Sequence, residues 1–121
     1  MVLIDANVMI RIIINDNKDM AQEAAKFISE NQVLIRNEVM AEIVYVLQKV
    51  YKIDRLEIYK LFRDIIEGAV IKTENHDVVL CAFKAFGEQN LDFVDCLLYA
   101  HNSINGNAVF TFDKALKKII N

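Results

Sequence analysis

The chain has 121 residues, enough for one domain, and its 17 acidic and 14 basic residues give a net charge of −3. Hydrophobic residues make up 55% of the sequence, which excludes a disordered chain and leaves apolar surface for a subunit interface beyond the core. Nucleic-acid binders usually carry an excess of Lys and Arg, so the charge argues mildly against such a partner. A cluster of metal-binding carboxylates would, however, lower the net charge by itself.

Short apolar runs alternate with segments of helical periodicity along the chain. The predicted strands span residues 2–4, 33–35, 69–71 and 108–111. The predicted helices span residues 19–31, 38–51, 54–67, 76–86, 93–104 and 114–120, and residues 7–15 have mixed helical spacing. Three helices are expected to begin at a capping side chain, from Asn37, Asp54 and Asp92. The expected apolar face of helix 19–31 consists of Met20, Ala24, Phe27 and Ile28.

Strands that are apolar on both faces are typical of a parallel sheet in an α/β layer fold. The chain has no proline and no stretch rich in Gly or Ser, so residues 1–121 are expected to form a single domain. The apolar N-terminus carries Asp5 and Arg11, which argues against a signal peptide or a membrane span. Cys81 and Cys96 have apolar neighbours, and we expect buried free thiols in a reduced, cytoplasmic protein.

Four acids lie where strands end or helices begin, and each of them could be a structural helix cap. Asp5 follows the first predicted strand and Asp113 follows the last, and both precede helices, where Asp is a favoured cap. Asp92 and Asp95 have the spacing of a capping box. In a parallel sheet, however, reactive groups gather outside the carboxyl ends of the strands, so these acids are also candidate site residues.

Glu42 is harder to explain as a structural residue. Its neighbours one helical turn away, Val39 and Val46, belong to the expected apolar stripe of helix 38–51, where an ionised carboxylate is costly unless it is paired or binds a metal. Hard cations such as Mg²⁺ prefer carboxylate oxygens, and converging carboxylates repel one another without such an ion. The sequence therefore predicts a divalent-metal site built from Asp5, Glu42, Asp95 and Asp113.

No competing catalytic set is present. Ser29 and Ser103 lie in no nucleophile motif, and His76 and His101 have no metal-ligand spacing, so zinc is not expected. The sequence also offers no obvious aromatic surface on which RNA bases could stack.

Four segments resemble the PIN domain family. V-L-I-D-A-N-V-M-I-R is similar to its opening strand and acid, and N-E-V-M-A-E-I-V-Y-V-L to the helix that presents its Glu. L-D-F-V-D-C-L-L-Y-A-H resembles the helix with the third acid, and A-V-F-T-F-D-K-A-L the final T-x-D segment. Order and spacing agree across nearly the whole chain. Small single-domain members are typically VapC-type toxins.

The resemblance implies a three-layer α/β/α fold with a central parallel sheet of four short strands, or five if an edge strand follows the last helix. It makes Asp5, Glu42 and Asp95 the main metal-binding and catalytic acids, with Asp113 as a fourth. Three further residues would support the site, namely Asn7, Thr111 and Asp92. Ala6 departs from the commoner Thr at its position, which removes a hydroxyl but no metal ligand.

The activity implied by the resemblance is endonucleolytic cleavage of RNA by metal-activated water, with Mg²⁺ or Mn²⁺ as cofactor. The implied partners are a VapB-type antitoxin and a second copy of the chain in a homodimer, with helices 20–31 and 54–67 as candidate contact surfaces. Basic side chains near the acids could bind the phosphate backbone of RNA. The candidates are Arg11, Lys114, Lys117 and Lys118. Arg11 could instead meet an antitoxin carboxylate, and the lysines could simply form a solvated helix face.

Two alternatives remain open from the sequence. One is a PIN-fold module that binds RNA or protein without cleaving RNA. The other is a phosphohydrolase or phosphate-receiver domain, which also places an Asp after a strand but usually needs a Lys after a later strand. Lys72 is the one candidate for that role.

Overall fold

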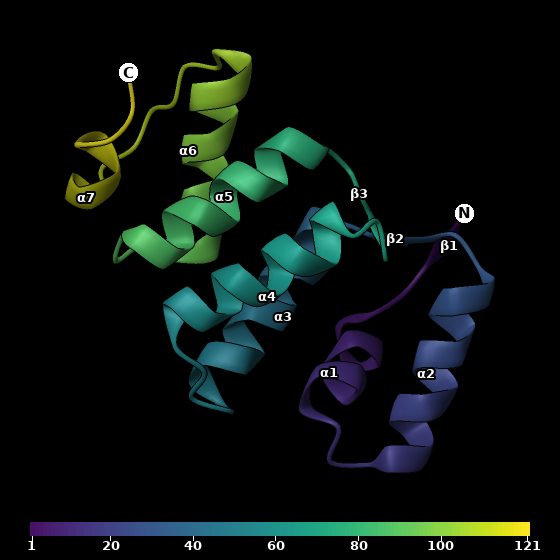
Figure 1. Cartoon of the computed structure of the whole chain (residues 1–121). Helices are drawn as coiled ribbons and strands as arrows, with labels where there is room; N and C mark the ends of the chain where they lie inside the picture. The colour runs from purple at the N-terminus through teal and green to yellow at the C-terminus, as the bar shows by residue number, and fades with distance from the viewer.

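The computed structural model describes residues 1–121, which form a mostly helical α/β fold with a small parallel sheet (Figure 1). The elements in chain order are β1 (Val2–Leu3), α1 (Ala6–Ile14), α2 (Lys18–Glu30), β2 (Val33–Ile35), α3 (Asn37–Lys49), α4 (Arg55–Glu67), β3 (Lys72–Thr73), α5 (His76–Glu88), α6 (Phe93–Asn105) and α7 (Lys114–Lys117). No helix is both long and apolar enough to span a membrane.

The sheet has the order β1-β2-β3, and both pairings are parallel. Val2 is paired with Val33, and Leu34 with Lys72. Since β2 lies between the other two strands, β1 keeps one edge without a neighbour. The predicted α/β class with a parallel sheet is confirmed, whereas the prediction of four or five strands is wrong, because the sheet has three.

The aromatic core lies between α4, α5 and the start of α6. The rings of Phe62 and Phe83 stack with centroids 4.7 Å apart, and Phe93 packs against Phe83 at 4.6 Å. These rings are buried, and each contributes about 1.5–3 kcal/mol through removal of apolar surface from water. Gly87 lets α5 approach α4 closely, because a Cβ at this position would lie 3.0 Å from the Cβ of Tyr59.

Only some of the predicted helix caps form. Asp5 accepts a hydrogen bond from the first turn of α1, whereas Asp54 and Asp92 occupy cap positions without a side-chain bond. Asn17, which was not predicted to be a cap, caps α2. The prediction for Asn37 is wrong, since it is already the first residue of α3. Its backbone N–H donates to the carboxylate of Glu74 at 2.7 Å, so a residue 37 positions later takes the role of the cap.

The third strand begins later than predicted because the end of α4 uses the intervening residues. The backbone N–H groups of Ala69 and Val70 donate to Ile66 and Ile65, and Ala69 adopts a φ of +57°. This left-handed residue ends the helix in a tight turn. The strand therefore spans Lys72–Thr73 rather than residues 69–71.

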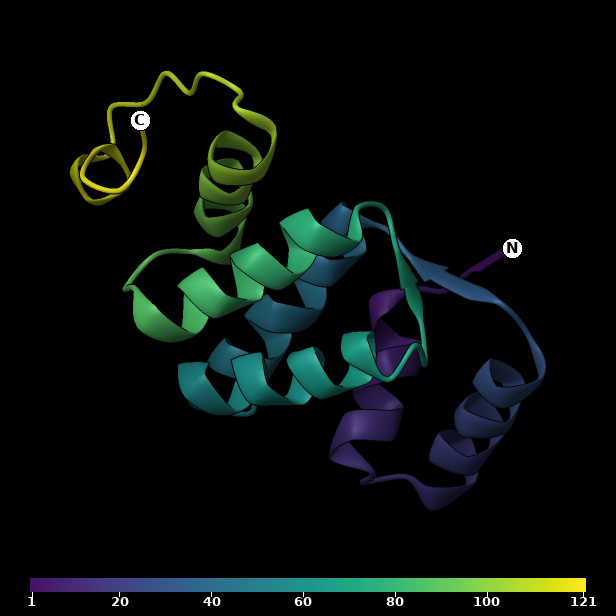
Figure 2. The same ribbon diagram turned by 45° about the horizontal axis from the view of Figure 1, so that its top comes forward.

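The predicted fourth strand, residues 108–111, does not pair with the sheet. Asn102, buried on α6, holds the C-terminal tail beside its own helix. Its amide donates to the carbonyl of Asn107 at 2.9 Å and accepts from the N–H of Asn121 at 3.0 Å. Leu116 of α7 is fully buried. The tail is therefore held on the side of the molecule away from β1 and the N-terminus (Figures 1 and 2).

The predicted apolar face of α2 is only partly buried. Ile28 is in the core, but Met20 and Phe27 are exposed. The helix is rotated so that Ala21 is buried instead. Apolar side chains of α2 thus remain on the surface next to β1, where they line a groove.

Arg55, at the start of α4, fixes the turn that connects α5 to α6. One terminal nitrogen, Nη1, donates to three carbonyl oxygens, those of Phe86 (3.2 Å), Gln89 (2.9 Å) and Leu91 (2.7 Å). The guanidinium also lies 4.3 Å from the centre of the Phe86 ring. These contacts satisfy carbonyls at the end of α5 and determine where α6 begins.

We expect Arg55→Ala to lower the free energy of unfolding by about 2–4 kcal/mol, because it removes charge-assisted hydrogen bonds and leaves carbonyls without a donor. Urea denaturation followed by circular dichroism measures this loss. The matched control is Arg63→Ala, since the one ion pair of Arg63 is with the neighbouring exposed Asp64 and its guanidinium lies 5.6 Å from the centre of the Tyr59 ring. Equal stability of the two variants would contradict the role of Arg55.

Candidate functional site

The carboxyl edge of the sheet carries three charged residues, one after each strand. Asp5 follows β1, Arg36 follows β2 and Glu74 follows β3. Parallel strands end at the same edge, where α/β folds usually place their chemistry. One oxygen of Asp5 accepts the N–H of Val8 at 3.2 Å, so the cap role is real. A carboxylate has two oxygens, and the cap leaves the other available to a ligand.

Arg36 and Glu74 were not among the predicted site residues. Arg36 Nε bonds Glu38 at 2.8 Å and lies 3.7 Å from Glu74. The hydrogen bond from Arg36 lowers the pKa of the Glu38 carboxyl and raises the pKa of the Arg36 guanidinium. Arg36 directly follows the predicted strand 33–35, and this position could have identified it. Glu74 directly follows β3 but lies three residues beyond the predicted strand 69–71.

Glu42 lies on α3 with an exposed side chain. The buried stripe of this helix consists of Met40, Ile43, Val44 and Leu47. Val39 and Val46 are only half-buried, because they lie at the margin of the stripe. The inference that burial forces Glu42 to find a partner is therefore wrong. Its candidacy rests on its place in the PIN-like helix alone.

A second acidic group gathers at α6 and α7. Asp95 is half-buried, and burial raises the pKa of its carboxyl, with a further rise from the negative charges of Asp113 and Asp92. Asp92 forms no capping bond, so the predicted capping box is absent. Asp113 accepts the N–H of Leu116 at 2.8 Å and donates its own N–H to Thr111 Oγ1 at 3.0 Å.

The structure does not bring the four predicted acids together in one chain. Asp5 begins α1, whereas Asp113 begins α7, and these helices lie on different sides of the molecule in both views (Figures 1 and 2). No group of three or more His, Cys, Asp or Glu side chains is close enough to hold a metal ion. The donor chemistry nevertheless suits Mg²⁺ or Mn²⁺, since carboxylate oxygens are hard ligands and the acids of α6 and α7 join none of the ion pairs.

A groove of about 250 Å³ runs between α3 and the start of α6, beside Asp92 and Asp95. Tyr45 and Lys49 line its α3 side, and the Tyr45 side chain is 62% exposed. Tyr45 therefore places one exposed aromatic ring beside the acids, which the sequence did not make obvious. Tyr45 and Lys49 were missed because only the packing of α3 against α6 brings them next to the acids.

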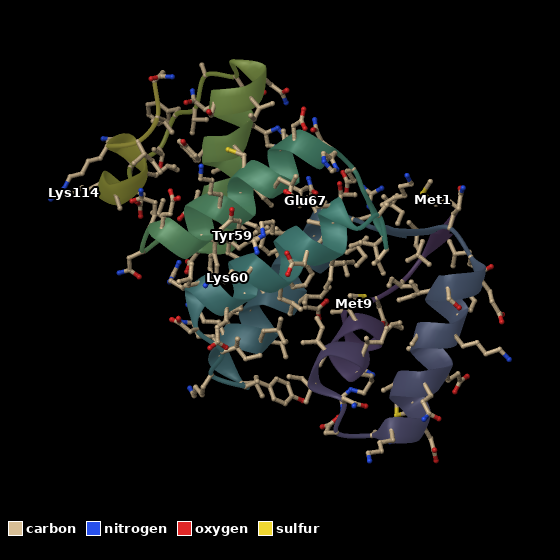
Figure 3. The ribbon with its side chains drawn as sticks, viewed as in Figure 1. Met1, Met9, Tyr59, Lys60, Glu67 and Lys114 are labelled. Atoms are coloured by element: carbon tan, nitrogen blue, oxygen red, sulfur yellow. The ribbon has the colours of Figure 1, made fainter.

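The other predicted residues are spread over the molecule. Asn7 is exposed in the first turn of α1, and Lys114 and Lys117 are exposed on α7, where Lys114 extends away from the body (Figure 3). Arg11 is already engaged, because it donates to Asp16 at 2.7 Å and to the hydroxyl of Tyr51 at 2.9 Å. The bond to Tyr51 is the main reason that the pKa of Arg11 is raised.

Lys72 is the candidate lysine of the phosphate-receiver alternative. It lies within β3, and β2 separates that strand from β1, which precedes Asp5. This arrangement gives no support to a pairing of Lys72 with Asp5.

We expect Asp92→Asn to lower the pKa of Asp95, because one of the negative charges that disfavour its ionised form is removed. The raised pKa means that ionised Asp95 destabilises the metal-free fold above the ordinary range of an Asp, so the variant should also be more stable at neutral pH. Carboxyl-carbon NMR titration measures the pKa. Asp19→Asn, on α2, is the control, and an unchanged pKa in Asp92→Asn would contradict the electrostatic coupling.

No curated protein and no solved structure matches the sequence. The family pattern described as PIN domain matches residues 2–120, which is nearly the entire chain. The segments that carry this match contain Asp5, Glu42, Asp95 and Asp113. The chain belongs to the PIN domain family.

Proposed function

We propose that this protein is a divalent-metal-dependent endoribonuclease that hydrolyses phosphodiester bonds in RNA. PIN domains are generally nucleases and usually use divalent metals. The observation that carries the proposal is the partly buried carboxyl of Asp95, whose pKa is raised by burial and by the charges of Asp113 and Asp92, and which belongs to no ion pair. Such an arrangement is costly in an empty protein and favourable around a cation.

Asp95 and Asp113 would hold Mg²⁺ or Mn²⁺, whereas Asp5, at the start of α1, lies away from the start of α7 in this structure. Glu42 is proposed as a further ligand from its place in the family's helix. The bound ion would supply a water of lowered pKa and neutralise charge on the phosphate. Thr111 orients the backbone of Asp113, and the capping bond to Leu116 fixes one of its oxygens. Since the raised pKa of Asp95 extends its protonated form to higher pH, protons compete with the metal above the usual Asp range.

RNA would approach through the groove between α3 and α6. Tyr45 presents an exposed ring on which a base can stack, and Lys49 offers a positive charge for a phosphate. Base stacking on an aromatic side chain contributes about 1–3 kcal/mol per base and tolerates any base. Lys114 and Lys117 on α7 extend the basic surface beyond Asp113.

The biological role we propose is that of a VapC-type toxin, cytoplasmic and paired with a VapB-type antitoxin. An apolar groove of about 650 Å³ is a suitable place for an antitoxin segment. It lies between α2 and the end of α4, with Ala25, Ile28 and Ile65 among its lining residues. An apolar side chain inserted there would be removed from water, as in other helix-in-groove complexes.

The second candidate is a PIN-fold module that binds RNA without cutting it. The absence of a complete acid cluster within one chain favours it. An RNA-binding and cleavage assay distinguishes the two functions. A binding module would bind RNA but would yield no cleavage product when Mn²⁺ is added.

We expect Asp95→Asn to reduce metal-dependent cleavage of single-stranded RNA by roughly a thousandfold, because a charged ligand is replaced by a neutral one. Asp19→Asn, with its carboxylate on α2, is the matched control. Product formation with Mg²⁺ or Mn²⁺ and with excess chelator gives the measurement, and circular dichroism checks the fold. A wild-type rate of RNA cleavage in Asp95→Asn, or cleavage that continues in excess chelator, would contradict the proposal.

A further inference from the structure

The groove between α3 and the start of α6 has the size of a pocket for a single base. Its volume is about 250 Å³, which lies just below the range of about 300–1,000 Å³ that is typical of pockets for drug-sized ligands. Its lining includes Val44, Phe86 and Phe93, which are buried members of the hydrophobic core. The groove therefore has an apolar floor and room for one base rather than for a longer piece of RNA.

Two exposed apolar side chains line the groove from opposite helices. Tyr45 of α3 is 62% exposed, and Val94 of α6 is 56% exposed. The ring of Tyr45 belongs to none of the aromatic pairs of the structure, so its face is available to a ligand. A flat ring that enters the groove would therefore remove apolar surface of both helices from water.

Gln48 gives the groove a polar group that has no partner. It lies three residues after Tyr45 on α3, is half-buried and lines the groove. Its side-chain amide takes part in none of the hydrogen bonds of the chain. Because a glutamine amide can both donate and accept, Gln48 is suited to the edge of a base that carries a donor beside an acceptor.

We propose that this groove binds one unpaired base of the RNA, with a preference for adenine, next to the phosphate that is cleaved. Tyr45 stacks on the base, Gln48 forms hydrogen bonds with its edge, and Lys49 attracts a neighbouring phosphate. The inference rests on the proposed ribonuclease function and adds a base preference to it.

The preference for adenine follows from the polar groups of the groove, because stacking alone tolerates any base. A glutamine amide pairs with adenine through two hydrogen bonds, accepting from the amino group N6 and donating to N7. The carboxylate of Asp92 also lines the groove, forms no capping bond and belongs to no ion pair. An ionised carboxylate only accepts, so it disfavours guanine and uracil, which present O6 and O4 where adenine and cytosine carry an amino group. Adenine offers the larger ring system to Tyr45 than cytosine does.

The groove lies where a bound base would bring its phosphate to the candidate metal site. Asp95 lines the same groove, and Glu42 lies one helical turn before Tyr45 on the exposed side of α3. Lys49 is exposed, lines the groove and belongs to no ion pair. A base within a duplex is stacked and paired, so the groove accepts only a base from a loop or a single strand.

The first test measures binding without cleavage, so it does not depend on the ribonuclease function. Fluorescence anisotropy in excess chelator gives the affinity of the full chain for short labelled uridine oligonucleotides that carry A, C, G or U at the centre. We expect the adenine oligonucleotide to bind roughly tenfold more tightly than the uridine one. Tyr45→Ala should weaken its binding roughly tenfold, whereas the matched control Tyr45→Phe keeps the ring and should bind as the wild type does. Equal affinity for all four oligonucleotides, no binding, or wild-type affinity in Tyr45→Ala would overturn the proposal.

The second test exchanges the group that is proposed to read the base. Gln48→Ala should bind the adenine and uridine oligonucleotides with nearly equal affinity, because no amide remains to distinguish them. The matched control is Gln32→Ala, since Gln32 lies outside this groove and should leave the preference unchanged. A preference for adenine that persists in Gln48→Ala would overturn the role of Gln48.

The third test adds Mn²⁺ and separates failure of this inference from failure of the ribonuclease function. We expect cleavage beside the single adenine of a uridine oligonucleotide, and Tyr45→Ala should raise KM for this substrate more than it lowers kcat. Cleavage without a base preference would overturn the base site and leave the ribonuclease function standing. Base-selective binding without any cleavage would contradict the ribonuclease function and support the base site.

Discussion

The partly buried carboxylate of Asp95 is the constraint on which the proposed site depends. Burial raises the pKa of Asp95, and the negative charges of Asp113 and Asp92 raise it further. None of these three acids belongs to an ion pair. A cation bound at Asp95 would favour its ionised form and offset this cost.

Hydrogen bonds within the chain fix the elements that carry these acids. Arg55 Nη1 donates to three carbonyl oxygens in the turn that leads into α6. The N–H of Asp113 donates to the hydroxyl of Thr111, and the carboxylate of Asp113 accepts the N–H of Leu116. The starts of α6 and α7 are therefore held in place by contacts of the chain itself.

Much of the fold follows from sequence pattern. β2 and the helices were predicted because their apolar periodicity is strong and their neighbours are local. The errors arose where distant residues decide the outcome. Glu74 accepts the N–H of Asn37, so it takes the cap role that was expected of Asn37 itself, although it lies 37 positions further along the chain. Asn102 binds the C-terminal tail beside α6, so the tail does not pair with the sheet. Neither hydrogen bond can be recognised from the spacing of apolar residues in the sequence.

The candidate site residues also fall into those that the sequence alone indicates and those that only the packing indicates. The residue types and their order made Asp5, Asp95 and Asp113 candidates, and their role as metal ligands stays a prediction. Glu42 was favoured for a burial that the structure does not have, since the stripe of α3 is centred on Ile43 and Leu47. Tyr45 becomes a candidate only once α3 and α6 are seen together.

Binding of Mn²⁺ tests most directly whether the acids form a metal site. Electron paramagnetic resonance counts free Mn²⁺ during titration of the wild type, of Asp95→Asn and of the control Asp19→Asn. We expect saturable binding at one site or more per chain in the wild type and the control, and affinity weakened roughly tenfold or more in Asp95→Asn. Equal affinity in the wild type and Asp95→Asn, or no binding to the wild type, would contradict the metal site.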